Sequence, residues 1–179
     1  LIKSLKEEFN ISNLCLAGGV ALNCVANGKI LKEKIFDNIW VQPAAGDAGG
    51  SLGAALALWY IEQNNSRKVD LNDSMHGSYL GPEYSQKDIE EHLDKAGAKY
   101  EIFKDQELLD RTATDLSKEE AVGWFQGRME FGPRALGGRS ILGDPRSEKM
   151  QKNLNLKVKY RESFRPFAPS ILKEDLSEW

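Results

Sequence analysis

The sequence has few of the residues that mark disulfide scaffolds, zinc sites and membrane spans. Of its 179 residues two are cysteine, Cys15 and Cys24, and they form no Cys-x-x-Cys pair. This argues against a disulfide-rich secreted scaffold and a zinc knuckle, and it suits a reducing cytoplasm. No apolar run reaches the roughly 18 residues that a membrane span needs. We therefore expect a cytoplasmic protein with no membrane partner, in which both cysteines are core residues.

Histidine is equally scarce, which limits the catalytic mechanisms that depend on a histidine base. His76 lies in a polar segment and His92 in a predicted amphipathic helix, and neither belongs to a Ser/His/Asp arrangement. This disfavours a covalent serine mechanism. The chain starts at Leu1 rather than methionine and stops on an apolar tip. We expect it to be a piece of a longer polypeptide, with room for one or two small domains.

The first part of the chain follows a strand–turn–helix pattern twice. An apolar run at 14–17 predicts a buried strand, and residues 39–41 predict a second strand. The first run leads into Gly18-Gly19, and the second leads into a glycine turn at 46–50 and an apolar helix over 51–63. Such turns point backbone N–H groups and a helix N-terminus toward a phosphate. Neither turn matches GxGxxG or a P-loop, so tight βα turns without a ligand remain an equal alternative.

A polar stretch at 64–74 predicts a linker or exposed loop, and the domain boundary is expected near residues 80–84. Ser85 with Asp88 predicts a capping box, and Gly97 predicts the end of that helix. Further elements are expected at 100–103 (strand), 106–119 (helix), 121–125 (strand) and 146–156 (helix).

The most unusual stretch is Gly127–Arg146, with four arginines, five glycines and two prolines. This is too much charge for a core, and too much glycine and proline for a long helix. Between Arg128 and Arg165 ten Lys/Arg stand against four Asp/Glu, a balance of +6. Because the whole chain carries −3, the residues outside this window carry −9. Positive charge focused on an acidic chain predicts a rigid loop region that holds a small anion, with a solvated basic surface as the alternative.

Three segments of this basic region carry a family resemblance: Phe131-Gly132-Pro133-Arg134-Ala135-Leu136-Gly137, Arg139-Ser140-Ile141-Leu142, and Arg161-Glu162 with Phe164-Arg165-Pro166-Phe167-Ala168-Pro169. Together they resemble the C-terminal half of the O-carbamoyltransferases of the nodulation and antibiotic-tailoring type. Gly138 departs from the pattern, where a bulkier polar residue is expected, and this should loosen the loop.

Segments 16–23 and 42–55 resemble the last part of the nucleotide-binding domain of the same family. That domain is of the actin/sugar-kinase type and is similar to the TsaD proteins. The resemblance implies an α/β protein with two parts. Residues 1–80 would end the TsaD-like domain, and residues 81–179 would form an incomplete YrdC-like α/β domain, the carbamoyltransferase C-terminal domain.

The resemblance also implies site residues in the first part. Gly18 and Gly19 would approach the nucleotide, and Asn23 would lie nearby. Asp47 matches a carboxylate that helps to hold a divalent metal, for which we expect iron. A single aspartate makes no metal site, and the histidine ligands of the family would precede Leu1.

In the second part the resemblance assigns the arginines to phosphate. Arg134, Arg139 and Arg165 are the predicted catalytic residues. The phosphate-binding set adds Ser140, Lys157 and Arg161 to these three. Ser140 is alternatively a turn residue, and Arg161 is alternatively an ion-pair partner of Glu162. Arg128 and Arg146 are expected to be positional.

The implied parent enzyme is a carbamoyltransferase of biosynthesis with carbamoyl phosphate, ATP and a hydroxyl-bearing acceptor as partners. ATP is its co-substrate, and the carbamoyl group passes through carbamoyladenylate to a hydroxyl of a small molecule or glycan. We expect this piece alone to be inactive, and a homodimer is compatible with the sequence. The alternatives are a non-catalytic nucleotide- or anion-binding module and a tRNA-modification protein related to TsaD and YrdC. The acidic net charge disfavours a nucleic-acid partner.

Overall fold

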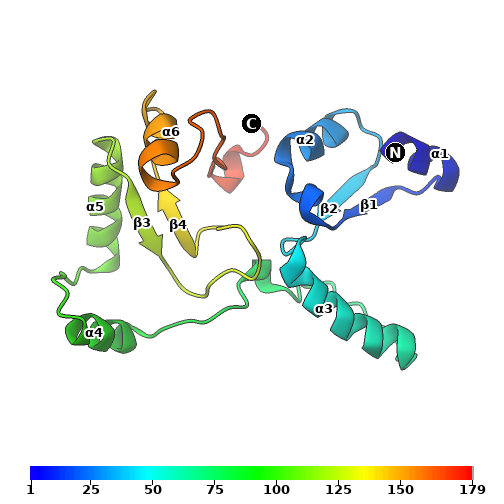
Figure 1. Ribbon diagram of the computed structural model, residues 1–179, viewed down its shortest axis with the longest axis horizontal. Helices are drawn as coiled ribbons and strands as arrows, with labels where there is room; N and C mark the ends of the chain where they lie inside the picture. Colours follow the sequence, from blue (N-terminus) through cyan, green and yellow to red (C-terminus); the bar gives the residue numbers. More distant parts are fainter. Residues whose placement is uncertain (179) are drawn as a thin grey trace. The chain divides into compact units, whose positions relative to one another are not determined.

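The computed structural model describes residues 1–178, which fall into two compact units (Figure 1). The first unit comprises Leu1–Tyr84 and the returning segment Gln126–Gly138. The second comprises Ser85–Phe125 and the residues from Arg139 onward. Both contain helices and a two-stranded sheet, so the prediction of an α/β protein is confirmed at this level.

The first unit is built on a parallel pair of strands, β1 (Asn13–Leu16) and β2 (Asn38–Val41). Helix α1 (Ile2–Phe9) precedes the pair. A 3-10 turn η1 (Gly19–Leu22) and helix α2 (Cys24–Lys32) make the crossover that a parallel pair requires, drawn in blue in Figure 1. Both predicted strands are present, with Asn13 opposite Asn38 in the register. Exposed and half-buried residues alternate along each strand, so the expectation that the first is buried is wrong.

Helix α3 spans Asp47–Ala57 and continues as a π-helical turn, η2 (Leu58–Glu62). The prediction of a glycine turn over 46–50 is wrong, because the helix already begins at Asp47. The turn lies earlier, at buried Ala44 and Ala45. Gly49 lies within this helix, and the position has no room for a side chain because a Cβ would overlap the carbonyl oxygen of Ala44.

Both cysteines are exposed, which contradicts their assignment to the core. Along β1 exposed and half-buried residues alternate, and Cys15 falls on the exposed face. Cys24 is the first residue of α2, and it is exposed at that helix end. The core of the first unit is formed instead by Ala21, Phe36, Ala44 and Ala45.

The second unit begins with helix α4 (Gln86–Lys95), whose capping box is formed as predicted. The Ser85 hydroxyl accepts from the Asp88 amide at 3.2 Å, and the Asp88 carboxylate accepts from the Ser85 amide at 3.0 Å. Gly97 follows in the left-handed region with φ +64°, as a helix-ending glycine does.

Helix α5 (Asp105–Ser117) packs against β3 (Val122–Phe125), which pairs antiparallel with β4 (Arg139–Leu142). Residues 100–103 form no strand, contrary to the prediction. Helix α6 (Met150–Asn153) runs into a π-helical turn, η4 (Leu154–Val158). Buried Met150 and Leu154 contact the backbone at Gly143. Two short 3-10 turns, η3 (His76–Ser78) and η5 (Lys173–Asp175), complete the elements.

Residues 64–74 form the irregular segment that the sequence predicts. Among residues 1–178, no helix has the length and apolar character to cross a membrane.

Candidate functional site

The loop that carries Arg134 is closed on itself by a buried carboxylate. Glu130 is 6% exposed, and its Oε1 accepts the backbone N–H groups of Leu136 and Gly138, each at 2.7 Å. The Gln126 amide then donates to the Gly138 carbonyl at 2.9 Å and shuts the base of the loop. A carboxylate that takes up two amides fixes a short loop strongly, because hydrogen bonds to charged groups are the stronger kind.

Gly138 is buried at this closure, so the expectation that it loosens the loop is wrong. A Cβ at this position would lie 2.6 Å from the Arg128 carbonyl oxygen and 3.2 Å from the Glu130 carboxylate. The absence of a side chain therefore lets the two ends of the loop approach each other.

The same loop is tied to the segment Ser78–Pro82 by a series of hydrogen bonds. Ser78 is fully buried, its hydroxyl donates to the Phe131 carbonyl at 2.6 Å, and its own carbonyl accepts from the Phe131 amide at 2.7 Å. The Tyr79 hydroxyl donates to the Leu136 carbonyl. These bonds hold the loop at both of its arms.

Gly132 brings the loop against the turn that precedes α3. Its φ is +138°, and a Cβ would lie 2.9 Å from the Pro43 carbonyl oxygen. On the other side of this turn, the Gly18 amide donates to the Ala45 carbonyl at 2.7 Å. The structure thus brings together three segments that the sequence singled out separately: the Gly18-Gly19 turn, the turn before Asp47, and the arginine loop.

Arg134 itself is exposed and makes no hydrogen bond or ion pair with any residue between Leu1 and Glu178. The backbone around it is anchored while its guanidinium group has all donors available. An arginine on an anchored backbone can bind an oxyanion through two parallel hydrogen bonds, and little conformational entropy is lost on binding.

The other predicted residues of the first unit have separate positions. Gly18 and Gly19 are exposed, and no atom lies within 4 Å of a Cβ built on either, so a ligand can approach this backbone. Asn23 caps α2, its Oδ1 accepting from the Ala26 amide at 3.1 Å. Asp47 is exposed in the first turn of α3.

The first predicted arginine of the second unit, Arg139, lies in a strand, whereas the sequence predicted a loop there. Arg139 is the first residue of β4 and its guanidinium carbon lies 3.3 Å from the centre of the Phe125 ring, a cation–π contact across the pair. Ser140 follows it in β4 opposite Trp124, so it is a strand residue and not a turn residue.

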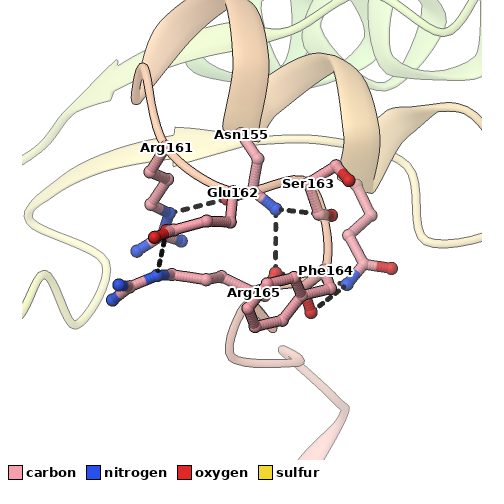
Figure 2. A network of polar contacts seen from close by, with 7 residues as sticks. Asn155, Arg161, Glu162, Ser163, Phe164 and Arg165 are labelled. Atoms are coloured by element: carbon pink, nitrogen blue, oxygen red, sulfur yellow. Dashed lines mark hydrogen bonds and ion pairs between the residues drawn. The ribbon is translucent and has the colours of Figure 1, made fainter.

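A second arginine pair lies on the loop after η4 (Figure 2). Arg165 Nε donates to Glu162 Oε2 at 2.7 Å, and Arg161 Nε donates to Asn155 Oδ1 at 2.6 Å. The ion pair considered for Arg161 is therefore made by Arg165. This bond and the nearby charge of Arg161 hold the pKa of the Glu162 carboxyl below its usual range. Lys157 lies in η4 with its side chain exposed.

Arg128 and Arg146 have partners of their own, in agreement with a positional role. Arg128 donates to the Gly81 carbonyl at 3.1 Å and lies 3.4 Å from Glu83. Arg146 forks onto Asp144, with Nε and Nη2 both donating to its carboxylate, and the backbone amide of Arg146 donates as well.

The Asp144–Arg146 pair predicts a pH-dependent stability. Hydrogen bonds from Arg146 lower the pKa of the Asp144 carboxyl to about 2. An unfolded aspartate titrates near ~3.9, so the stabilisation is complete above about pH 4 and is lost as the pH falls toward 2. Arg146→Ala should therefore reduce the free energy of unfolding more at about pH 5 than at about pH 3, by urea denaturation. Arg67→Ala, in the irregular segment, is the control and should show no such difference; an equal loss at both pH values for Arg146→Ala would contradict the linkage.

Comparison with known proteins decides the family. Residues 1–56 match the model of the carbamoyltransferase N-terminus, and residues 113–179 match that of the carbamoyltransferase C-terminus. The chain belongs to the carbamoyltransferase family. Together these matches include the Gly18-Gly19 turn, Asp47, Arg134 and the Arg161–Arg165 loop.

Relatives of this carbamoyltransferase-family chain match almost all of it. It is 58% identical over 97% of its length to an uncharacterised protein of Synechocystis. It is 43% identical over 100% to the nodulation protein NolNO of Sinorhizobium fredii, and 46% identical over 97% to the nodulation protein NolO of Bradyrhizobium diazoefficiens. The chain spans 28%, 26% and 31% of the lengths of these relatives.

The metal implied by the family finds only a partial fit in this carbamoyltransferase-family chain. Among residues 1–178 no group of three His, Cys, Asp or Glu side chains is placed to hold a metal ion. Asp47 supplies one carboxylate, and a hard or borderline cation needs several ligands. The described residues therefore do not form a metal site by themselves.

Two residues of the site escaped the sequence analysis. Glu130 was counted only as one acid in a basic window, and no local sequence signal marks it as the acceptor of the Leu136 and Gly138 amides. Asn155 lies between apolar Leu154 and Leu156 and is fully buried. A polar residue within such an apolar helical run is the signal that could have identified it.

Proposed function

We propose that the full-length protein is an O-carbamoyltransferase that uses carbamoyl phosphate and ATP. Water would cleave the O–P bond of carbamoyl phosphate to give carbamate and inorganic phosphate, and a carbamate oxygen would then attack the α-phosphorus of ATP and release pyrophosphate. The resulting carbamoyladenylate would give its carbamoyl group to a hydroxyl of a small molecule or glycan, releasing AMP and a proton. Family membership supports the transfer of a carbamoyl group.

The observation that carries the proposal is the arginine loop of the first unit. Its backbone is closed by Glu130 and packed on the turn before α3, while the Arg134 guanidinium is left without a partner among residues 1–178. Because the backbone is already held, only the Arg134 side chain has to order when it stabilises developing charge on phosphoryl oxygens. We assign Arg134 to this role and Gly18-Gly19 to the approach of the nucleotide.

The remaining roles extend the same proposal. Arg139 and Arg165 would complete the catalytic arginines, with Lys157, Arg161 and Ser140 binding phosphate. Asn23 would reach the nucleotide only if its side chain gave up the cap of α2. Asp47 would join metal ligands, iron being the proposed ion, from other parts of the protein.

The proposal includes the domain assignment as well. Residues 1–80 would belong to an actin/sugar-kinase-type, TsaD-like domain and residues 81–179 to a YrdC-like one. The protein would act in the cytoplasm, and a homodimer is its proposed assembly.

The experiment that tests this function is carbamoyl-phosphate-dependent exchange of labelled pyrophosphate into ATP, measured on the full-length protein with its metal. Exchange that requires carbamoyl phosphate would support the adenylation step. Complete absence of exchange in a folded, metal-loaded protein would overturn the carbamoyladenylate route. A non-catalytic anion-binding module would then be the better account.

A further inference from the structure

The loop that carries Arg161 and Arg165 is organised by one buried amide. Asn155 is the largest fully buried side chain among the described residues, with 0% exposure. Its Nδ2 donates to the carbonyls of Ser163 at 3.1 Å and Arg165 at 2.8 Å, and its Oδ1 accepts from Arg161 Nε at 2.6 Å. An asparagine side chain has two N–H donors and a carbonyl oxygen, so both donors and the acceptor are in use.

The backbone of Asn155 adds a further constraint. Its carbonyl accepts the Arg161 amide at 3.0 Å, so the residue holds Arg161 through both main chain and side chain. Asn155 lies in the π-helical turn η4, a widened helical turn of the kind often found at functional sites.

Gln151, one turn earlier in α6, holds the far end of the loop. Its Nε2 donates to the carbonyls of Phe164 at 3.2 Å and Arg165 at 3.1 Å. The Arg165 carbonyl thus receives N–H groups from two amide side chains. Gln151 is exposed, so it can be replaced with little risk to folding.

These bonds determine where the two arginines point. In Figure 2 both guanidinium groups extend to the same side of the loop, with Glu162 between them. Glu162 lies close to both charges, since Arg165 and Arg161 each lower the pKa of its carboxyl. The amides and Glu162 use only the Nε atoms, and the terminal nitrogens of both arginines make no hydrogen bond to a residue in the range 1–178.

We propose that Asn155 and Gln151 are positioning residues that hold Arg161 and Arg165 as a preformed pair for a phosphate-bearing substrate. The inference rests on the proposed function, in which these arginines bind phosphate. Asn155 orients the pair by fixing the loop carbonyls and the Nε of Arg161, and Gln151 supports it at Arg165. Aspartate or leucine in place of Asn155 has a similar shape but lacks both donors, so neither can replace it.

The test compares variants of the full-length protein for binding of inorganic pyrophosphate by calorimetry. Asn155→Ala should weaken binding about tenfold, because it removes the donor to the Ser163 carbonyl and the acceptor of Arg161 Nε. Gln151→Ala should weaken it about threefold, because it removes only the donor to the Phe164 carbonyl and one of the two donors to the Arg165 carbonyl. Asn153→Ala is the matched control, since Asn153 is exposed on the same helix, and it should bind as the native protein does. Arg161→Ala and Arg165→Ala report on the arginines themselves.

A second measurement separates positioning from general stability. Trypsin can cut the Arg161–Glu162 bond, whereas the Arg165–Pro166 bond resists it. Asn155→Ala should speed the cut at Arg161 relative to cuts elsewhere, and Asn153→Ala should not. In the exchange reaction the same variant should raise KM for a phosphate substrate, and its fall in kcat should be smaller than that of Arg165→Ala.

The outcomes separate the inference from the function it rests on. Weaker pyrophosphate binding by both arginine variants, with native binding by Asn155→Ala and Gln151→Ala, would overturn the positioning role and leave the arginine clamp intact. Native binding by all four variants would overturn the clamp as well. If Asn155→Ala does not fold, Gln151→Ala decides, and unchanged binding in that variant contradicts the proposal.

Discussion

Arg134→Ala should reduce carbamoyl-phosphate-dependent exchange of pyrophosphate into ATP by at least about a hundredfold, the loss expected for one preorganised donor to a transition-state oxyanion. The free energy of unfolding should change by less than about 0.5 kcal/mol, since an exposed side chain without partners contributes little to stability. Glu130 and Gly132 keep the loop backbone in place without the guanidinium group. The measurement is the exchange rate beside urea denaturation, both on the full-length protein.

The controls for this variant address charge and geometry separately. Arg111→Ala removes an exposed arginine that pairs with Asp115 on α5, and it should leave exchange unchanged. Arg134→Lys keeps the charge without the planar fork, and it should fall between the native protein and Arg134→Ala. Exchange at the native rate in Arg134→Ala would remove Arg134 from the site.

Gly49→Ala has the largest effect expected on stability. A Cβ there would overlap the carbonyl oxygen of Ala44, a backbone atom in a fully buried residue that has no flexible side chain to yield. We expect a loss of about 3 kcal/mol or more in the free energy of unfolding, in the range of severe overpacking. The measurement is again urea denaturation. Exchange should fall too, because the displaced turn supports Gly132 of the arginine loop.

Gly53→Ala is the matched control on the same helix. No atom lies within 4 Å of a Cβ built at Gly53, so only the helix propensity changes. The substitution should stabilise the protein by up to about 1 kcal/mol. Equal stability of the two variants would show that α3 does not depend on the close approach to Ala44.

Local patterns in the sequence were sufficient where the interaction is local. The capping box of Ser85 and Asp88 joins residues three apart, and the positive φ of Gly97 needs no distant partner. The strands β1 and β2 were also predictable, since each is a short apolar run closed by a turn.

The failures involve partners that are distant in the sequence. β4 was predicted as loop, because its pairing with β3 spans the intervening segment 126–138 and no local signal marks it. Residues 100–103 alternate like a strand but have no partner strand in the described structure. The start of α3 was placed late because Gly49 suggested a turn, whereas the packing of Ala44 requires a helical glycine there.

The same distinction between local and distant interactions holds for the candidate site. The residue types for an anion site, with Arg134, Arg161 and Arg165 among them, follow from charge and glycine content. The contact of Gly132 with Pro43 joins segments almost ninety positions apart, and no periodicity in the sequence contains it. The roles of Glu130 and Asn155 depend on which backbone groups turn toward them, and that is a property of the folded chain.

The closure of the Arg134 loop by Glu130 affects the thermodynamics of ligand binding. The conformational entropy of the loop is given up during folding, before any ligand arrives. Binding at Arg134 then orders one side chain and buries little apolar surface, so its heat capacity change is small. A flexible loop with the same arginine would lose conformational entropy each time it bound, and it would therefore bind the same anion more weakly.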